Sequence, residues 1–479
     1  MTLKKQIFNN TAVQLIGKIL STALNLFTFA IITRELGQSG FGAYTTVITF
    51  LSFFAILADL GLTLVTVQML GEEQKEQNRT LGNLFGLRLS SSLLMIGLAP
   101  FVVMAFSYSQ EIKLGVAIAA ASFVFNALNQ VMVGLFQTKL KMDRVAWAET
   151  LSRVSMLLGV IVVVKLKWGL QGVLLATSLA GFISFVLHYY FARQFAYIRP
   201  IFNWQEWKKI LRLSWPLTIT IALNLIYLKA DTLLLSLFKS QAEVGLYGAA
   251  YKIIDVLSSL PFMFAGIILP LLVAAWQEKN KERFNTILQK SFDILAMAAI
   301  PMVIGVQFLA DEIMIFIAGS EFQGAGNIFR LLIFAIAAIF LGNMMAHAII
   351  AVKKQKSVIW IYILVSLSSL VAYLYLIPRF SYYGAAAVTI YSELSIALLS
   401  GIFICRYLKF KLNFQGLKKS LLASVLMGAI IYLLPTNLTK SAWGLILVIL
   451  LAGFIYLASL LLLKAFSAKD LKLIIGKQM

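Results

Sequence analysis

The chain alternates between apolar runs of about 20 residues and short polar segments. A helix needs about 20 apolar residues to cross the hydrocarbon of a bilayer. By that measure the sequence predicts fourteen membrane-spanning helices and an all-α polytopic membrane protein. The approximate limits of these spans are 10–33, 42–68, 84–106, 114–137, 147–164, 171–192, 213–237, 245–274, 291–310, 328–352, 357–377, 384–405, 420–435 and 442–463.

A repeat relates the two halves of the chain. The pattern Q-x-x-x-G-x-Y at Gln38 returns 203 positions later at Gln241, and an offset of 212 relates Gly172 to Gly384. Each predicted unit has six spans, an even number, so both units insert the same way up and are related by a pseudo-twofold axis along the membrane normal. The predicted parts are a six-helix bundle in 1–195, a cytoplasmic amphipathic linker in 196–212, a second six-helix bundle in 213–406, and an additional transmembrane hairpin with a cytoplasmic tail in 407–479.

Composition and charge support a membrane protein. Hydrophobic residues make up 60% of the chain and charged residues only 13%, far from the usage of soluble domains. The net charge of +21 follows topology, because 28 of the 41 basic residues fall in alternate polar segments. By the positive-inside rule both termini are predicted to be cytoplasmic. The basic residues form no patch with interleaved aromatics, which argues against a nucleic-acid partner.

The sequence offers little for metal or cofactor chemistry. Cys405 is the single cysteine, and His188 and His347 are each alone in their spans, so neither a metal site nor a bound cofactor is predicted. No phosphate-binding loop and no nucleophile–base set is found in a recognisable context. These observations argue against an ATP-driven pump and against an enzyme.

Charged residues inside the spans are the candidate functional groups. A charge at the centre of a spanning helix costs about 2.5–3.5 kcal/mol on insertion scales, so it is expected to face a wet cavity or to pair. Lys18 and Asn25 lie on one helical stripe of the first span, and Asp59 ends a polar stripe of the second. Lys18 and Asp59 are eight and nine residues from the same membrane face, so we expect them to lie at one depth and to pair.

The sequence resembles a known family of exporters. The block R-E-L-G-Q-S-G-F-G-A-Y from Arg34, D-L-G from Asp59 and V-G-L-Y-G-A-A-Y from Val244 are similar to the polysaccharide transporter branch of the multidrug/oligosaccharidyl-lipid/polysaccharide exporter superfamily. The resemblance implies a flippase, not an enzyme, in the bacterial cytoplasmic membrane. Such a flippase moves an undecaprenyl-pyrophosphate-linked oligosaccharide to the outer leaflet by alternating access, for surface polysaccharides such as O-antigen.

The chemistry of such a substrate suggests roles for the candidate residues. An anionic diphosphate with many sugar hydroxyls needs cations, hydrogen-bonding groups and aromatic platforms. The residues predicted to bind substrate are Lys18, Asn25, Arg88, Asn126, Lys229, Tyr251 and Lys252. The acids predicted to couple transport to H⁺ or Na⁺ are Asp59, Asp231, Asp255 and Glu393.

Other interpretations remain open at this stage. The charged residues equally suit structural ion pairs, Asn25 and Asn126 suit interhelical hydrogen bonds, and Arg88 suits snorkelling to the cytoplasmic interface. For the whole protein the alternatives are a lipid II flippase, a multidrug exporter of the same superfamily, and a non-transporting scaffold of a polysaccharide assembly complex. Expected partners are the lipid-linked glycan, membrane lipids and a polysaccharide polymerase complex.

Overall fold

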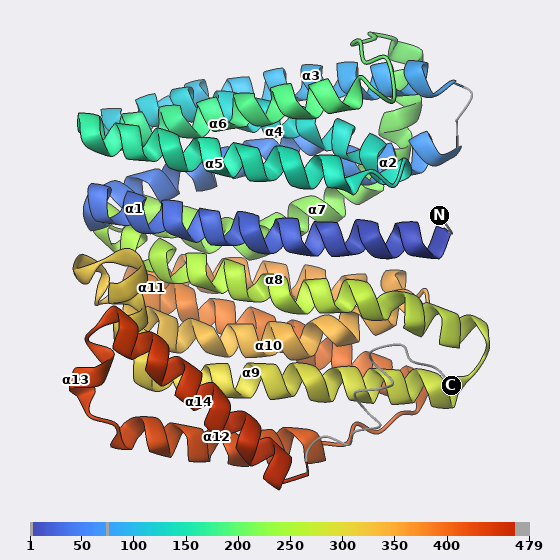
Figure 1. Cartoon of the computed structure of the whole chain (residues 1–479). Helices are drawn as coiled ribbons and strands as arrows, with labels where there is room; N and C mark the ends of the chain where they lie inside the picture. Colours follow the sequence, from blue (N-terminus) through green and yellow to red (C-terminus); the bar gives the residue numbers. More distant parts are fainter. Residues whose placement is uncertain (1–2, 73–75, 465–479) are drawn as a thin grey trace. The chain divides into compact units, whose positions relative to one another are not determined.

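The computed structural model describes residues 3–72 and 76–464, with side chains except at 3–15, 64, 71–72, 216–228 and 436. No β-strand occurs within these ranges, which are mostly helical (Figure 1). The helices are α1 (Leu3–Asp59), α2 (Leu62–Glu72), α3 (Gln77–Val102), η2 (Val103–Ala105), α4 (Gln110–Thr138), α5 (Met142–Leu166), α6 (Gly169–Ala192), α7 (Trp204–Phe238), α8 (Gln241–Gln277), α9 (Lys281–Ala318), η3 (Ser320–Phe322), α10 (Ala325–Ala351), α11 (Gln355–Leu408), α12 (Gln415–Leu433), α13 (Thr436–Thr439) and α14 (Ala442–Leu462).

Within the described ranges, eleven helices are long and apolar enough to cross a membrane. Two of them contain a non-helical residue at which two helices meet, Gly37 in α1 and Ser381 in α11. Helix α7 contains the seventh predicted span. The predicted all-α membrane fold is therefore confirmed, whereas the number of fourteen crossings stays a prediction.

The chain forms two compact units, Met1–Gly245 and Leu246–Met479. In the first, α4 packs against α1, α3 and α6, and α5 packs against α1 and α6. In the second, α10 packs between α9 and α11, while α12 and α14 pack against α9. The predicted limits of the bundles and their twofold axis stay predictions, and the predicted cytoplasmic tail from 465 onward lies outside the described residues.

Several helix starts are capped by short polar side chains. In each case a side-chain oxygen accepts a backbone N–H of the first turn, which has no partner inside the helix. Capping residues of this kind are Ser109 for α4, Asn203 for α7, Ser240 for α8, Asn280 for α9 and Ser441 for α14, whereas α3, α5 and α6 begin without one. The sequence thus marks these helix starts locally, independently of the hydrophobic runs.

Several helix ends have a lysine where glycine is usual, and four of them share one hydrogen-bond pattern. After α5, α8, α10 and α11 the chain turns through a left-handed residue, and the next backbone N–H reaches a carbonyl five residues back. These left-handed residues are Lys167, Lys279, Lys353 and Lys409, with φ between 54° and 58°. A side chain is strained at such φ values, so these turns carry a small conformational cost.

The additional hairpin is joined to the second unit by a buried tyrosine. The hydroxyl of Tyr456 in α14 donates to the carbonyl oxygen of Met297 in α9 (2.6 Å) and bonds the Ser420 hydroxyl in α12 (2.8 Å). Apolar residues of α9, α12 and α14 form one core around it. The hairpin is therefore packed on the unit through both apolar and polar contacts.

Candidate functional site

The second predicted span is broken in the middle of its sequence. Helix α1 ends at Asp59, the backbone turns through Leu60 (φ 48°) and Gly61 (φ 70°), and α2 begins at Leu62. A break inside a membrane leaves backbone groups without helical partners, and these must be satisfied by neighbouring groups. The polar side chains around Asp59 supply such partners.

Arg88 of α3 binds this break. Its Nη1 donates to the Asp59 carbonyl oxygen (2.9 Å) and pairs with Oδ1 (2.5 Å), while Nη2 donates to Thr63 Oγ1 (3.1 Å). Its Nε donates to the carbonyl oxygen of Ala127 in α4 (3.0 Å). Thr63 in turn donates to Asp59 Oδ1 (2.6 Å). One guanidinium thus connects α1, α2, α3 and α4.

The position of this pair corrects two expectations. Asp59 pairs with Arg88, not with Lys18. Arg88 is only 3% exposed and does not snorkel to the interface. The reason is that α3 begins at Gln77, seven residues before the expected start of the span, so Arg88 lies about 16 Å along the helix. No sequence signal distinguished Arg88 from Lys18 as the partner of Asp59.

The other candidates of the first unit differ in exposure. Lys18 and Asn126 are exposed, and Asn25 and Lys229 are half-buried. Asp231 is 1% exposed, and its Oδ1 accepts hydrogen bonds from the Thr232 amide and hydroxyl. Their roles as substrate or ion ligands stay predictions.

The candidates of the second unit lie on α8 and α11. Tyr251 and Lys252 are half-buried and Asp255 is exposed, and the ring of Tyr251 lies 5.6 Å from that of Tyr247. Glu393 on α11 is buried, one helical turn after Thr389. The roles of these residues in binding substrate or coupling ions also stay predictions.

The sequence repeat corresponds to a repeated hydrogen bond. In the first unit the Tyr44 hydroxyl bonds the side chain of Thr177. In the second unit the Tyr247 hydroxyl bonds Thr389 Oγ1 at 3.3 Å. The tyrosines are separated by 203 positions and the threonines by 212, which are the two offsets of the repeat. Sequence reasoning did not identify these threonines. Each lies five residues after one of the two glycines, Gly172 and Gly384, that the offset of 212 relates.

Glycines of the repeat allow the backbones of α1 and α8 to come into direct contact. All the residues of this contact belong to the first unit. A Cβ at Gly42 of α1 would overlap the carbonyl oxygen of Gln241, at the first residue of α8. A Cβ at Gly245 would overlap the carbonyl oxygen of Gln38. Thr46 also donates to Gln241 Oε1 (2.7 Å). The motif residues of one repeat therefore contact those of the other reciprocally, as small residues do at close helix crossings in membranes.

The described residues contain no group of three or more His, Cys, Asp or Glu that would hold a metal ion. Their chemistry is that of polar and charged groups held on membrane helices, namely a buried ion pair between Arg88 and Asp59 and further cations, amides and acids. Such groups bind and release ions or an anionic head group. This chemistry suits translocation of a solute.

Comparison with known proteins agrees with this chemistry. Residues 7–276 match the polysaccharide biosynthesis protein family. The chain is 21% identical over 433 residues to the probable low-salt glycan biosynthesis flippase Agl15 of Haloferax volcanii, covering 87% of each chain. It is also 21% identical over 346 residues to the succinoglycan biosynthesis transport protein ExoT of Rhizobium meliloti, covering 68% of this chain and 66% of ExoT.

The fold is similar to that of a solved flippase structure. The lipid II flippase MurJ, in an inward closed conformation, aligns with a TM-score of 0.78 over 93% of this chain and 97% of that chain, at 19% identity. At this identity the likeness concerns the fold. The family match over more than half of its length shows that the chain belongs to the polysaccharide biosynthesis protein family.

Proposed function

We propose that this protein is a flippase that moves undecaprenyl-pyrophosphate-linked oligosaccharide units across the bacterial cytoplasmic membrane for surface polysaccharide biosynthesis. The family match over residues 7–276 is the observation that carries the proposal. The glycan flippase and transport proteins among its relatives, and the fold likeness to a lipid II flippase, support it. In this proposal both termini are cytoplasmic and the protein works beside a polysaccharide polymerase.

The mechanism proposed is alternating access driven by an ion. Two units built from one repeat are the architecture with which many transporters expose a site to one side of the membrane and then to the other. Lys18, Lys229 and Lys252 bind the diphosphate, and Asn25, Asn126 and Tyr251 bind the sugars. Uptake of H⁺ or Na⁺ at Asp59, Asp231, Asp255 or Glu393 resets the cycle, because an acid in a membrane titrates readily when its partners change.

The function is tested by inactivating the gene and identifying the lipid-linked glycan that accumulates on the cytoplasmic leaflet. We expect an oligosaccharide on undecaprenyl pyrophosphate to accumulate and the surface polysaccharide to disappear. Accumulation of lipid II with loss of wall synthesis would instead establish the lipid II flippase that the fold likeness also suits. Unchanged glycans with increased drug sensitivity would overturn both.

The predicted substrate cations are tested separately. In a flippase-null strain we expect Lys18→Ala combined with Lys229→Ala to reduce export about tenfold or more, because each lost cation weakens binding of a diphosphate. Lys113→Ala combined with Lys239→Ala removes the same charge, from the start of α4 and from the segment between α7 and α8, and serves as the control. Full export by the first variant, at the same membrane level as the control, would contradict the substrate role of these lysines.

A further inference from the structure

The segment that leads into α7 packs on α3 and is not a free linker. The backbone N–H of Ile201 donates to the Gly82 carbonyl oxygen (2.9 Å), and that of Tyr197 donates to Asn78 Oδ1 (3.0 Å). The Tyr189 hydroxyl donates to the Ile198 carbonyl oxygen (3.3 Å). One side of the segment therefore packs against α3 and α6, and its other side is exposed.

The first turns of α7 separate these two sides clearly. Ile210 and Ser214 are buried, and Ile210 packs with Trp207 in an apolar core. On another stripe of the helix Trp204 and Trp215 are 68% and 60% exposed. We call the exposed side the linker face. It consists of Tyr197, Phe202, Trp204, Lys208, Arg212 and Trp215.

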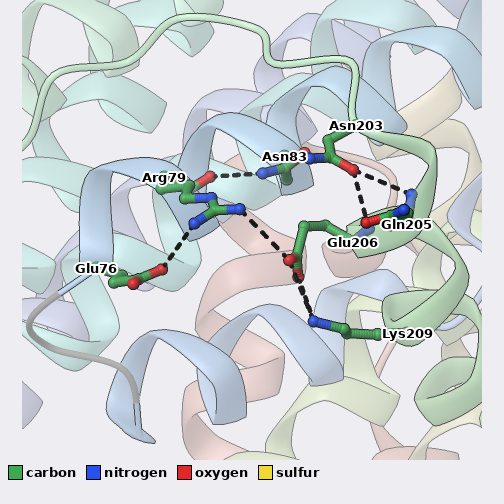
Figure 2. Close-up of polar contacts among 7 residues, drawn as sticks. All are labelled: Glu76, Arg79, Asn83, Asn203, Gln205, Glu206 and Lys209. Atoms are coloured by element: carbon green, nitrogen blue, oxygen red, sulfur yellow. Dashed lines mark hydrogen bonds and ion pairs between the residues drawn. The ribbon is translucent and has the colours of Figure 1, made fainter.

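The only acid between 193 and 215 is neutralised on the inner side. Figure 2 shows Glu206 between two cations, with its Oε1 3.1 Å from Lys209 Nζ and 3.6 Å from Arg79 Nη2. Arg79 also lies 3.5 Å from Glu76. By contrast, the side chains of Lys208 and Arg212 make no hydrogen bond or ion pair with any residue that the structure describes. Among the residues that the structure describes, no acid therefore compensates the positive charge of the linker face.

We propose that the linker face is a binding surface for anionic phospholipid head groups. Exposed tryptophans do not suit water alone, and exposed Lys208 and Arg212 do not suit the hydrocarbon. Aromatic rings mixed with basic side chains are typical of the head-group layer, and basic residues there attract anionic lipids. Because the ion pair between Arg79 and Glu206 joins this helix to α3, a bound head group fixes the start of α7 against α3.

A simpler explanation is that these basic residues only orient the chain during insertion. That explanation predicts no preference for one lipid in the folded protein. Our proposal predicts a preference for phosphatidylglycerol over phosphatidylcholine that depends on Lys208 and Arg212. The inference does not depend on the proposed transport function, because lipid binding is measured without transport.

The experiment measures lipid binding to the purified full-length protein by native mass spectrometry. Phosphatidylglycerol and phosphatidylcholine with the same acyl chains are titrated separately. We expect phosphatidylglycerol to bind about tenfold more tightly, and Lys208→Gln combined with Arg212→Gln to remove most of that preference. Lys411→Gln combined with Lys418→Gln is the matched control, because it removes two charges from a segment predicted to lie on the same membrane side, and its preference is expected to stay unchanged.

Two outcomes overturn the proposal. One is equal binding of the two lipids by the native protein, and the other is an equal loss of preference in both double variants. If the Lys208/Arg212 variant does not fold, the exchange Lys208→Arg with Arg212→Lys keeps both charges and must retain the preference. In the native protein, raised ionic strength must weaken binding of phosphatidylglycerol and leave that of phosphatidylcholine unchanged.

Discussion

The ion pair between Arg88 and Asp59 shows that one buried guanidinium can satisfy several polar groups at once. The guanidinium satisfies one carboxylate, two backbone carbonyls and one hydroxyl. We expect Arg88→Met to destabilise the protein by about 3–5 kcal/mol, because it leaves the Asp59 carboxylate without its cation. Thermal unfolding of the purified variant in detergent measures this cost.

The matched control for this prediction replaces both partners. Arg88→Met combined with Asp59→Leu removes both charges, so we expect it to recover at least half of the lost stability. A single variant as stable as the native protein would contradict the structural importance of the pair. Transport by the double variant separates the roles, since a folded but inactive protein would favour substrate or ion binding at this pair over a purely structural function.

Sequence reasoning found the importance of both residues but not their pairing. Asp59 was identified because a carboxylate is rare inside an apolar run. Its partner depended on where α3 begins, and the residues from Gln77 to Asn83 are too polar to count as part of a span. The hydrophobic run therefore underestimated the length of α3. It placed Arg88 about two turns too close to the start of the helix.

At the scale of helices, the sequence predicted the presence of each span more accurately than the residues at which helices begin, break or end. The predicted spans fall on helical segments because apolar length is a strong signal, although the second is divided between α1 and α2. The breaks at Gly37 and Ser381, and the turn from Asp59 to Leu62, depend on local backbone geometry. Gly37 and Gly61 are glycines at positive φ and so give a sequence signal, whereas Ser381 and Leu60 take positive φ values that their residue types rarely adopt.

The lysines at the helix ends provide a test at this scale. Lys409 is exposed, with φ of 54° after α11. We expect Lys409→Gly to stabilise the protein by about 1 kcal/mol, because glycine adopts this conformation without strain. Thermal unfolding measures the gain. Lys411→Gly, two residues away and without a positive φ, is the control and should bring no gain. An unchanged midpoint for Lys409→Gly would show that this turn is not strained.

The reciprocal glycine contact provides a second test. Gly42→Ala places a methyl group on the carbonyl oxygen of Gln241, so we expect a loss of about 1–3 kcal/mol and a lower membrane level of folded protein. Gly97→Ala is the control, because no atom lies within 4 Å of the place its new methyl group would take and alanine favours a helix. Equal behaviour of the two variants would contradict the close contact.

At the scale of the whole molecule, the repeated tyrosine–threonine bond predicts equal energetics in both units. Tyr44→Phe and Tyr247→Phe each remove one hydroxyl bonded to a threonine, so we expect each to cost about 0.5–1.5 kcal/mol. Two bonds that act independently would give costs that add to within about 0.5 kcal/mol. Thermal unfolding of both single variants and the double variant checks this. A large deviation from additivity would show that the bonds are coupled.

The duplication itself was readable from sequence because its two offsets preserve identical residue types. The tyrosine–threonine bonds at these repeated positions could not be predicted from sequence, since Thr177 and Thr389 are ordinary polar residues in apolar helices. Their role depends on which tyrosine reaches them after folding. The sequence pattern thus predicts two repeated units, and only three-dimensional packing identified the tyrosine–threonine bond found in each half.

The buried arginine also constrains how the polypeptide is made. A lone α3 would have to carry the Arg88 guanidinium into lipid, at a cost comparable to the gain from several leucines. Its acidic partner emerges from the ribosome earlier, at the end of α1. The growing chain is therefore expected to retain its first two crossings beside the translocon until the third arrives, so that the pair enters the bilayer already neutralised.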